Sequence, residues 1–406
     1  MLMTKSTSLP PIWPGRRWQR PAIFRSTRSR KAVTISGTAR RPGMASPSAS
    51  FYRPTDKSKR KVIDMARLLA WLLASACALS ALQSAARADD TNRISVLEEN
   101  DSPYFNTDKH YTQGLRLSNL GPDVESGSGW NGPFDLAGRL APVFSQDGSS
   151  PRSTRRYALF LGQSIFTPQN QALKPPDPRD RPYAGWLYVG TSLLQESNRH
   201  MLENLELDLG VVGPASLARQ TQNDFHQFIG VAQAQGWSHE IQTEPGGMLT
   251  YERLWRIALV GDRDNGIDVV PQLGATVGNI MTYGAAGGLL RVGKNLRADY
   301  GPARIRPALS GTDYFDADHL DGDLGFYVFA GAQGRVVGQN IFLDGNSFRT
   351  SPSVDKRVFV ADLQAGFSLF WSRSWRIDIS GIRRTREYDG QHTPDVIGTA
   401  TLSFSM

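Results

Sequence analysis

The stretch 98–120 contains three polar residues whose types and positions suit metal-binding and oxyanion chemistry. Asn100 and Asp101 follow a short run of alternating apolar residues, and Thr112 lies where the next such run begins. Two strand ends joined by a polar loop lie close together at one edge of a sheet. The Asp101 carboxylate could bind a hard cation such as calcium, and Asn100 could bind the same metal or donate to an oxyanion. The alternative is an ordinary Asx turn beside a structural Thr112 hydroxyl.

A second polar pair lies on an expected helix between residues 216 and 232. Apolar residues recur there at roughly helical spacing after Pro214, and Gln222 and His226 are four apart, so they share one helix face. A neutral imidazole can act as a general base near neutral pH, with Gln222 orienting a water. The alternative is a hydrogen-bonded helix-surface histidine without a catalytic role.

Other hydrolytic chemistries lack the necessary residues. None of the remaining histidines after residue 88 has a metal-ligand partner at HExxH or similar spacing, which disfavours a zinc hydrolase; they are His110, His200, His239, His319 and His392. No G-x-S-x-G elbow occurs, so a serine nucleophile on an α/β-hydrolase scaffold is unsupported. The only cysteine, Cys77, lies in an N-terminal apolar run. Disulfides and thiol chemistry are therefore not expected in the remainder.

The first 88 residues have the composition of segments that do not belong to the working protein. Basic residues precede an apolar run, Leu68–Leu82, which is too short to span a bilayer, and Ala86-Arg87-Ala88 forms a small-x-small cleavage site. Residues 61–88 are therefore predicted to be a secretory signal peptide. Residues 1–60 are rich in Arg, Ser and Pro without apolar periodicity, which predicts disorder or an untranslated extension upstream of Met65.

The charge of the whole chain is misleading about its partners. Residues 1–88 contain 17 of the 46 Lys and Arg residues but only 2 of the 38 Asp and Glu residues. The remaining 29 basic and 36 acidic residues give 89–406 a net charge of about −7. A nucleic-acid-binding function is therefore not supported.

Residues 89–406 alternate between apolar and polar side chains in about twelve runs separated by Gly, Asp, Asn and Pro. No run of about 18 apolar residues occurs after Asp89, which excludes helical membrane spans. The runs are Ile94–Glu98, Tyr111–Leu120, Tyr157–Phe166, Gly185–Leu194, Leu205–Val212, Met248–Val260, Ile267–Val277, Tyr283–Val292, Gly325–Val337, Phe359–Trp371, Trp375–Arg383 and Ile397–Met406. This pattern predicts an all-β transmembrane antiparallel barrel of about twelve strands. A soluble β-sandwich would also alternate and is the alternative.

A barrel with its N-terminus in the periplasm places three loops on the outside: 99–110, 167–184 and 213–247, the last with the short helix. It also places 121–153 and 296–323 on the side where turns are usually short, so either these turns are unusual or the strand parity slips there. The aspartate-rich stretch 311–325 lacks EF-hand spacing and is expected to be a solvated acidic loop.

Aromatic residues near strand ends are expected to form an interfacial girdle; they are Trp186, Tyr188, Phe326, Tyr327, Trp371 and Trp375. Nearby, Arg181 could contact lipid phosphates.

Taken together, these segments resemble the outer-membrane lipid A 3'-O-deacylases over most of residues 94–406. The resemblance rests on Asn100-Asp101, Tyr111-Thr112-x-Gly114-Leu115, Asp180-Arg181-Pro182-Tyr183-Ala184-Gly185-Trp186, Gln222-x-x-x-His226, Gly236-Trp237-x-x-x-Ile241 and Ile341-Phe342-Leu343-Asp344-Gly345-Asn346.

The resemblance implies an outer-membrane barrel whose active site faces the outer leaflet. It implies calcium-dependent hydrolysis of the ester-linked acyloxyacyl group at the 3' position of lipid A, with lipopolysaccharide as the substrate. His226 would be the general base and Asp101 would hold the calcium. Asn100, Thr112 and Gln222 would line the same site.

The sequence departs from the family at two positions. The family also uses a lysine after the second hairpin, and no lysine occurs around Gly162-Gln163-Ser164. It also uses a glutamate beyond the histidine, which could be Glu240 or Glu244. Phosphate recognition and the remaining metal ligands therefore stay open. So do two alternative functions, an outer-membrane phospholipase with a serine near His226 and a non-catalytic pore or structural barrel. The oligomeric state is not defined by the sequence.

Overall fold

The computed structural model describes residues 92–101, 108–140, 144, 153–262, 264–305, 311–317 and 320–405. The chain divides into units 1–54 and 55–406, and the described residues all belong to the second. The expectations for 1–60 and 61–88 therefore lie outside the described residues. Within those residues, no helix is both long and apolar enough to span a bilayer.

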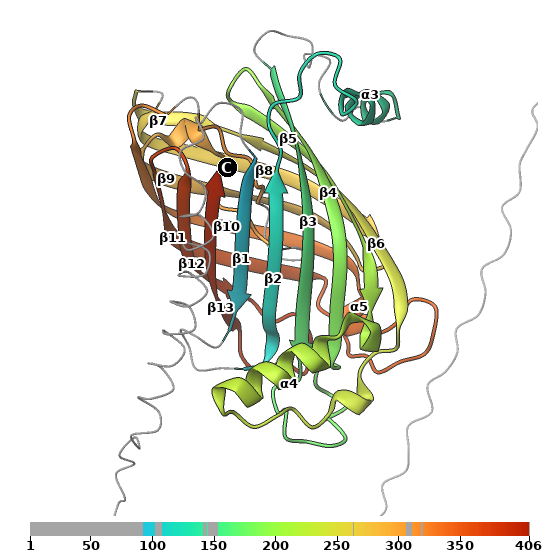
Figure 1. The fold of residues 1–406 in the computed structure, drawn as a ribbon. Helices are drawn as coiled ribbons and strands as arrows, with labels where there is room; N and C mark the ends of the chain where they lie inside the picture. The colour runs from blue at the N-terminus through green and yellow to red at the C-terminus, as the bar shows by residue number, and fades with distance from the viewer. Residues whose placement is uncertain are drawn as a thin grey trace, which may run out of the picture. The chain divides into compact units, whose positions relative to one another are not determined.

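The described chain is mostly β-strand (Figure 1). The strands are β1 (Arg93–Asn100), β2 (His110–Leu120), β3 (Ser153–Thr167), β4 (Ala184–Ser197), β5 (Met201–Val212), β6 (Glu244–Trp255), β7 (Ile257–Gly261), β8 (Asn265–Gly278), β9 (Met281–Lys294), β10 (Leu324–Asn340), β11 (Phe359–Trp371), β12 (Trp375–Arg384) and β13 (Asp395–Ser405). The helices are α3 (Asn131–Leu140), η2 (Gly213–Ser216), α4 (Ala218–Ile229), η3 (Trp237–His239), η4 (Leu296–Ala298) and α5 (Ile341–Asp344).

The strands form one closed antiparallel barrel. Each strand pairs with its sequence neighbours, β1 pairs with β13, and β6 pairs with β8 to complete the ring. β6 and β7 are one strand interrupted at Arg256, whose backbone N–H turns away and donates to the His200 carbonyl oxygen at 2.7 Å. The predicted twelve-stranded barrel is thus confirmed, and Met248–Val260 corresponds to the interrupted strand.

Alternation along the strands produces an apolar outside and a polar inside. In β10, Val328 and Val336 are more than half exposed on the outer wall, whereas Gln333 and Arg335 are buried inside. The predicted aromatic girdle is therefore only partly correct. Three of the six aromatics are buried at 2% exposure or less, namely Trp186, Tyr188 and Tyr327.

The two ends of the barrel differ. At the α4 end lie the long connections that include α4 and α5, and the three predicted outer loops all reach this end (Figure 1). At the opposite α3 end, the connection from β2 to β3 contains α3. Its Phe134 packs with Phe144 against the outward-facing Leu193, beside Tyr157 of the outer wall.

The connection between β9 and β10 accounts for the long stretch 296–323 at the α3 end, where turns are usually short. It contributes a plug segment, residues 296–305 and 311–317, whose Leu296, Tyr300, Tyr314 and Phe315 are buried among inward-facing residues of the strands. The strand assignment therefore holds, because this connection fills the barrel interior.

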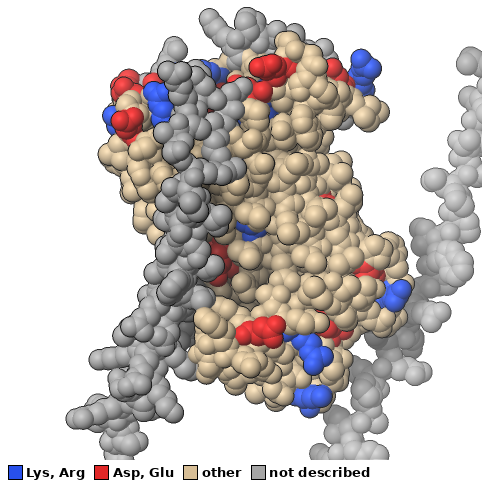
Figure 2. Space-filling view, in the orientation of Figure 1, with Lys and Arg blue, Asp and Glu red and all other residues tan. Residues whose placement is uncertain are grey.

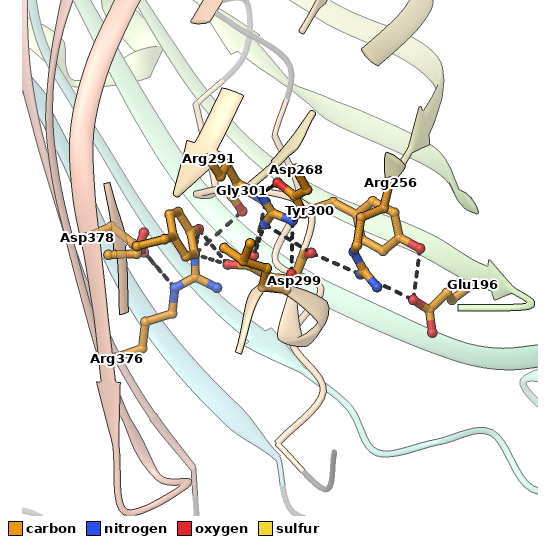
Figure 3. Close-up of polar contacts among 12 residues, drawn as sticks. Glu196, Arg256, Asp268, Arg291, Asp299, Tyr300, Gly301, Arg376 and Asp378 are labelled. Carbon is orange, nitrogen blue, oxygen red and sulfur yellow. Dashed lines mark hydrogen bonds and ion pairs between the residues drawn. The ribbon is translucent and has the colours of Figure 1, made fainter. Parts of the chain in front are cut away.

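Buried charges anchor the plug segment (Figure 3). Asp299 pairs with Arg291 of β9 and, at 2.6 Å, with Arg376 of β12, and it accepts a hydrogen bond from the Tyr327 hydroxyl at 2.7 Å. Arg376 also contacts Asp378 at 2.9 Å. Such interior ion pairs persist when each charge has several partners.

The expectation of a solvated acidic loop at 311–325 is wrong for its first part. Asp313 binds Arg116 and Ser118, and Asp316 is buried and lies 3.4 Å from Arg199. Asp321 and Asp323 are exposed, and position 318 lies outside the described residues.

Candidate active site

Helix α4 lies across the outer wall of the barrel at the ends of β3 and β4 (Figure 1). The approach is close at Gly185, where an added Cβ would lie 2.3 Å from the Cβ of Ala218 at the start of the helix. Ala218, Ile165 of the wall and Trp237 form one buried cluster beneath it. The helix ends at Gly230, which adopts the left-handed conformation at φ 68° that glycine permits. This packing fixes the face that carries Gln222 and His226, both buried.

His226 contacts a carboxylate that the sequence patterns did not identify. Its Nδ1 lies 2.8 Å from the Ala232 carbonyl oxygen, and its Nε2 lies 3.0 Å from Asp108 Oδ2. Burial lowers the pKa of His226, but the hydrogen bond and charge of Asp108, together with the Ala232 carbonyl, outweigh burial and raise the pKa above its ordinary value. The ring therefore has its Nδ1 proton fixed, and Nε2 is the nitrogen that exchanges a proton.

A chain of hydrogen bonds joins Gln222 to Thr112. The Trp237 indole N–H donates to Gln222 Oε1 at 2.9 Å, and Gln222 Nε2 donates to Gln171 Oε1 at 3.1 Å. Gln171 Nε2 in turn donates to Thr167 Oγ1 at 3.1 Å and to the Asp108 carbonyl oxygen at 2.6 Å. The Thr167 and Thr112 hydroxyls lie 2.6 Å apart.

Asp101 reaches the same network through the backbone. The Lys109 N–H, next to Asp108, donates to Asp101 Oδ2 at 2.6 Å. A β-bulge between Tyr111 and Gln113 places Thr112 beside Thr167. The connection after β1, the start of β2 and helix α4, bridged by Gln171, thus bring Asp101, Thr112, Gln222 and His226 into one connected cluster.

Asn100 lies at the end of β1 directly before Asp101, and it is buried. Its side chain hydrogen-bonds Glu98, two residues back on the same strand face. It therefore lies at the border of the cluster, next to Asp101.

Three members of the cluster were missed from the sequence: Asp108, Thr167 and Gln171. Each lies in a loop or at a strand end, and none belongs to a spaced motif. Their position in the chain was the one feature that could have indicated them. Asp108 lies in the same polar loop as Asp101, and Gln171 lies in the second predicted outer loop.

The two candidate glutamates lie apart from His226. Glu240 borders a separate pocket of about 360 Å³ with Arg219 and Trp237, and burial raises its pKa to about 7 against the opposing effect of Arg219. Glu244 accepts hydrogen bonds from Asn346, Ser347 and Phe348, so it organises the connection after α5.

Arg181, expected to contact lipid phosphates, is 1% exposed. Its Nη1 lies 3.5 Å from Glu387, and its guanidinium covers the Phe166 ring, so that interpretation is wrong.

The donor set beside Asp101 consists of oxygen atoms, which is the chemistry that calcium prefers. Asp101 is a buried carboxylate, and Thr112 and Thr167 contribute hydroxyls nearby. Among the described residues, no three His, Cys, Asp or Glu side chains converge here, so a calcium ion would need neutral oxygens as further ligands. Asp101 is therefore the carboxylate of this set that fits the ion, with neutral oxygens as the other donors.

Comparison with known proteins identifies the family. A model described as outer membrane protein LpxR matches residues 69–406. The solved structure of LpxR from Salmonella typhimurium is similar with a TM-score of 0.59 and 18% identity, covering 77% of this chain and 100% of that chain. The beta domain of the Bordetella autotransporter BrkA has a TM-score of 0.35 and 11% identity, covering 78% of this chain and 98% of that chain. The KdgM porin has a TM-score of 0.32 and 8% identity, covering 77% of this chain and 99% of that chain. No curated protein matches.

The structural likeness shows a shared fold, and the family match covers more than half of the chain. The resemblance predicted from the sequence motifs is confirmed, as is the location in the outer membrane. The chain therefore belongs to the LpxR family of outer membrane proteins.

Proposed function

We propose that this protein is a lipid A deacylase that hydrolyses the ester-linked acyloxyacyl group at the 3' position, with calcium. The observation that carries the proposal is the His226–Asp108 pair, held on the outer wall at the α4 end and joined by hydrogen bonds to Thr112. A site on the outer wall meets a lipid substrate directly, whereas a site inside the filled barrel would not.

The arrangement supports a general-base mechanism. Nδ1–H of His226 donates to Ala232, so Nε2 is the nitrogen that takes the proton of a water as the water oxygen attacks the ester carbonyl; the water must then occupy the position beside Nε2 that Asp108 Oδ2 holds in this structure. The imidazolium that forms lies 3.0 Å from Asp108, whose charge stabilises it. Collapse of the tetrahedral intermediate breaks the bond to the sugar oxygen, and that oxygen takes the proton back from Nε2. The products are a carboxylic acid and a free sugar hydroxyl.

The other residues of the cluster hold these groups in place. Gln222 and Gln171 fix α4 against the loop of Asp108, and Thr112 and Thr167 present hydroxyls at the edge of the wall. Asp101 would hold calcium, which when bound supplies positive charge to polarise the ester carbonyl and stabilise the oxyanion.

The test is mass spectrometry of lipid A from cells that express residues 65–406. We expect loss of one acyloxyacyl unit relative to cells with an empty vector. Unchanged lipid A, with the folded barrel present in the outer membrane and calcium supplied, would overturn the proposal.

Removing calcium should abolish the activity, because the described residues around His226 offer no cationic side chain in contact with its imidazole to replace the metal charge. We expect a chelator to reduce hydrolysis by the purified protein to background and added calcium to restore it. Asp101→Asn should require more calcium for the same rate. Full activity in excess chelator would show that the reaction does not use the metal.

Replacing Asp108 should shift the pH dependence of hydrolysis. The raised pKa of His226 keeps the ring protonated to higher pH, so kcat/KM should rise as pH increases through that pKa. Asp108→Asn removes the charge that raises the pKa, so the rising limb should move to lower pH. Asp224→Asn, an exposed position on the same helix, is the charge-matched control and should leave the limb in place. If the rise of kcat/KM with pH occurs at the same pH in both variants, Asp108 does not set the pKa of His226.

Two other functions remain as outcomes of these tests. A phospholipase would release fatty acids from glycerophospholipids and leave lipid A intact; the described groups at the imidazole nitrogens are Asp108 and Ala232, and neither is a serine. A pore is opposed by the plug segment, which fills the interior with buried aromatic and paired charged residues.

A further inference from the structure

The outer wall next to the cluster is hollowed over β1 to β5. The hollow has a volume of about 580 Å³, and almost all of its lining is apolar. Figure 2 shows charged side chains gathered at the two ends of this face of the protein, with few in the band between them. A bounded hollow differs from a flat lipid-facing wall because it can hold one hydrocarbon chain in a defined place.

Strand register builds the hollow from two rows of outward-facing side chains. The first row crosses four neighbouring strands and consists of residues about half exposed: Leu117, Leu161, Val189 and Leu209. The second row lies two residues nearer the α3 end: Asn119, Leu159, Thr191 and Leu207. The shorter side chains of Asn119 and Thr191 in the second row leave the space on either side of Leu159.

A row of larger side chains lies beyond the hollow at the α3 end. The third row of the wall contains Tyr157 and Leu193, and Phe134 of α3 packs against it. The Trp130 ring stacks on Tyr157 with centroids 4.0 Å apart. These side chains pack together across the direction of the strands, in the row next to the lining of the hollow, and are called its floor below.

At the α4 end the hollow is covered on one side and open on the other. On β3, Gln163 donates to the Ser216 carbonyl at 2.7 Å, so the start of the α4 connection covers the wall there. On β2, Leu115 is 45% exposed and lies between the hollow and Thr112. From Leu117 to Thr112 the distance along the strand is roughly 16 Å at about 3.3 Å per residue. An acyl chain whose ester lies beside Thr112 would therefore reach the hollow along β2.

We propose that this hollow is the acyl-chain subsite of the His226 centre and that its floor sets the preferred chain length. The occupant is one saturated acyl chain of the lipid whose ester lies beside Thr112. The lining is apolar, the hollow opens towards the cluster, and the membrane presents acyl chains along this wall. The inference rests on the proposed function, since it assigns a substrate part to the same site.

Leu161 is the position from which the volume can be changed most cleanly. It faces outward between Leu117 and Val189, so a new side chain there projects into the hollow and leaves the barrel interior unchanged. Leu161→Trp fills the hollow and Leu161→Ala enlarges it. Leu273→Trp is the matched control, because Leu273 is 57% exposed on β8 and does not line the hollow.

The experiment presents the purified, calcium-loaded protein with equal amounts of two synthetic lipid A molecules that differ in the length of the 3' acyl chains. The ratio of released acids is measured by mass spectrometry. Leu161→Trp should change the ratio about tenfold in favour of the shorter chain, which is the usual discrimination of an apolar pocket. Leu161→Ala should shift it towards the longer chain, and Leu273→Trp should match the unchanged protein.

Two results would overturn the proposal, and they have different consequences for the proposed function. Release of both acids at the original ratio by Leu161→Trp and Leu161→Ala would show that the hollow holds only surrounding bilayer lipid, while deacylation stands. No release by the unchanged protein would overturn both the subsite and the proposed function. Val189→Trp, which fills the same row from β4, replaces Leu161→Trp if that variant does not fold.

Discussion

We expect His226→Ala to lower the rate of lipid A hydrolysis by about 10²- to 10⁴-fold, the range of a lost general base. Nε2 of His226 is the nitrogen that exchanges a proton, and the alanine side chain has no group that could take its place. The measurement is the release of acid from lipid A in detergent micelles, with calcium present.

A control variant must show that a lower rate reflects lost catalysis and not a misfolded barrel. His239→Ala removes an exposed histidine from the same outer connection and should leave the rate unchanged. Both variants should keep the heat-dependent gel mobility of a folded barrel. Equal rates for His226→Ala and His239→Ala would rule out a catalytic role for His226.

The second large effect concerns stability. Asp299→Ala should destabilise the barrel by about 3–5 kcal/mol, the usual cost of removing one partner from buried charges. It leaves Arg291 and Arg376 without their shared carboxylate and removes the acceptor of the Tyr327 hydroxyl. Urea unfolding in lipid vesicles measures the change.

Asp321→Ala is the comparison for that variant, because Asp321 lies in the same connection between β9 and β10 and is exposed. It should leave the urea midpoint unchanged. If Asp299→Ala unfolds at the same urea concentration as Asp321→Ala, the plug segment is not held by these charges.

The strands were predictable because one physical rule governs them all. A barrel wall exposes every second residue to hydrocarbon, so runs such as Gly325–Val337 and Phe359–Trp371 are readable as alternation. The alternation of exposed residues does not indicate where a strand is interrupted. At Arg256 the chain leaves the ladder for a contact with His200, and nothing in the local pattern marks that break.

The plug segment was not predictable for a different reason. Residues 296–305 and 311–317 have no periodicity, and their burial depends on partners on distant strands, such as Arg376 for Asp299. The same limit applies to the site. His226 and Gln222 share a helix face that spacing reveals, whereas Asp108 meets His226 only after two loops have been brought together.

The pairing of β1 with β13 has a consequence for biogenesis. The first strand finds its second neighbour only when the last strand has been synthesised, so the ring closes at the end of assembly. The plug segment precedes β10 and is enclosed by the barrel that the later strands complete. It must therefore enter the interior before β1 pairs with β13. The pairing of β1 with β13 is therefore the step that encloses the plug segment.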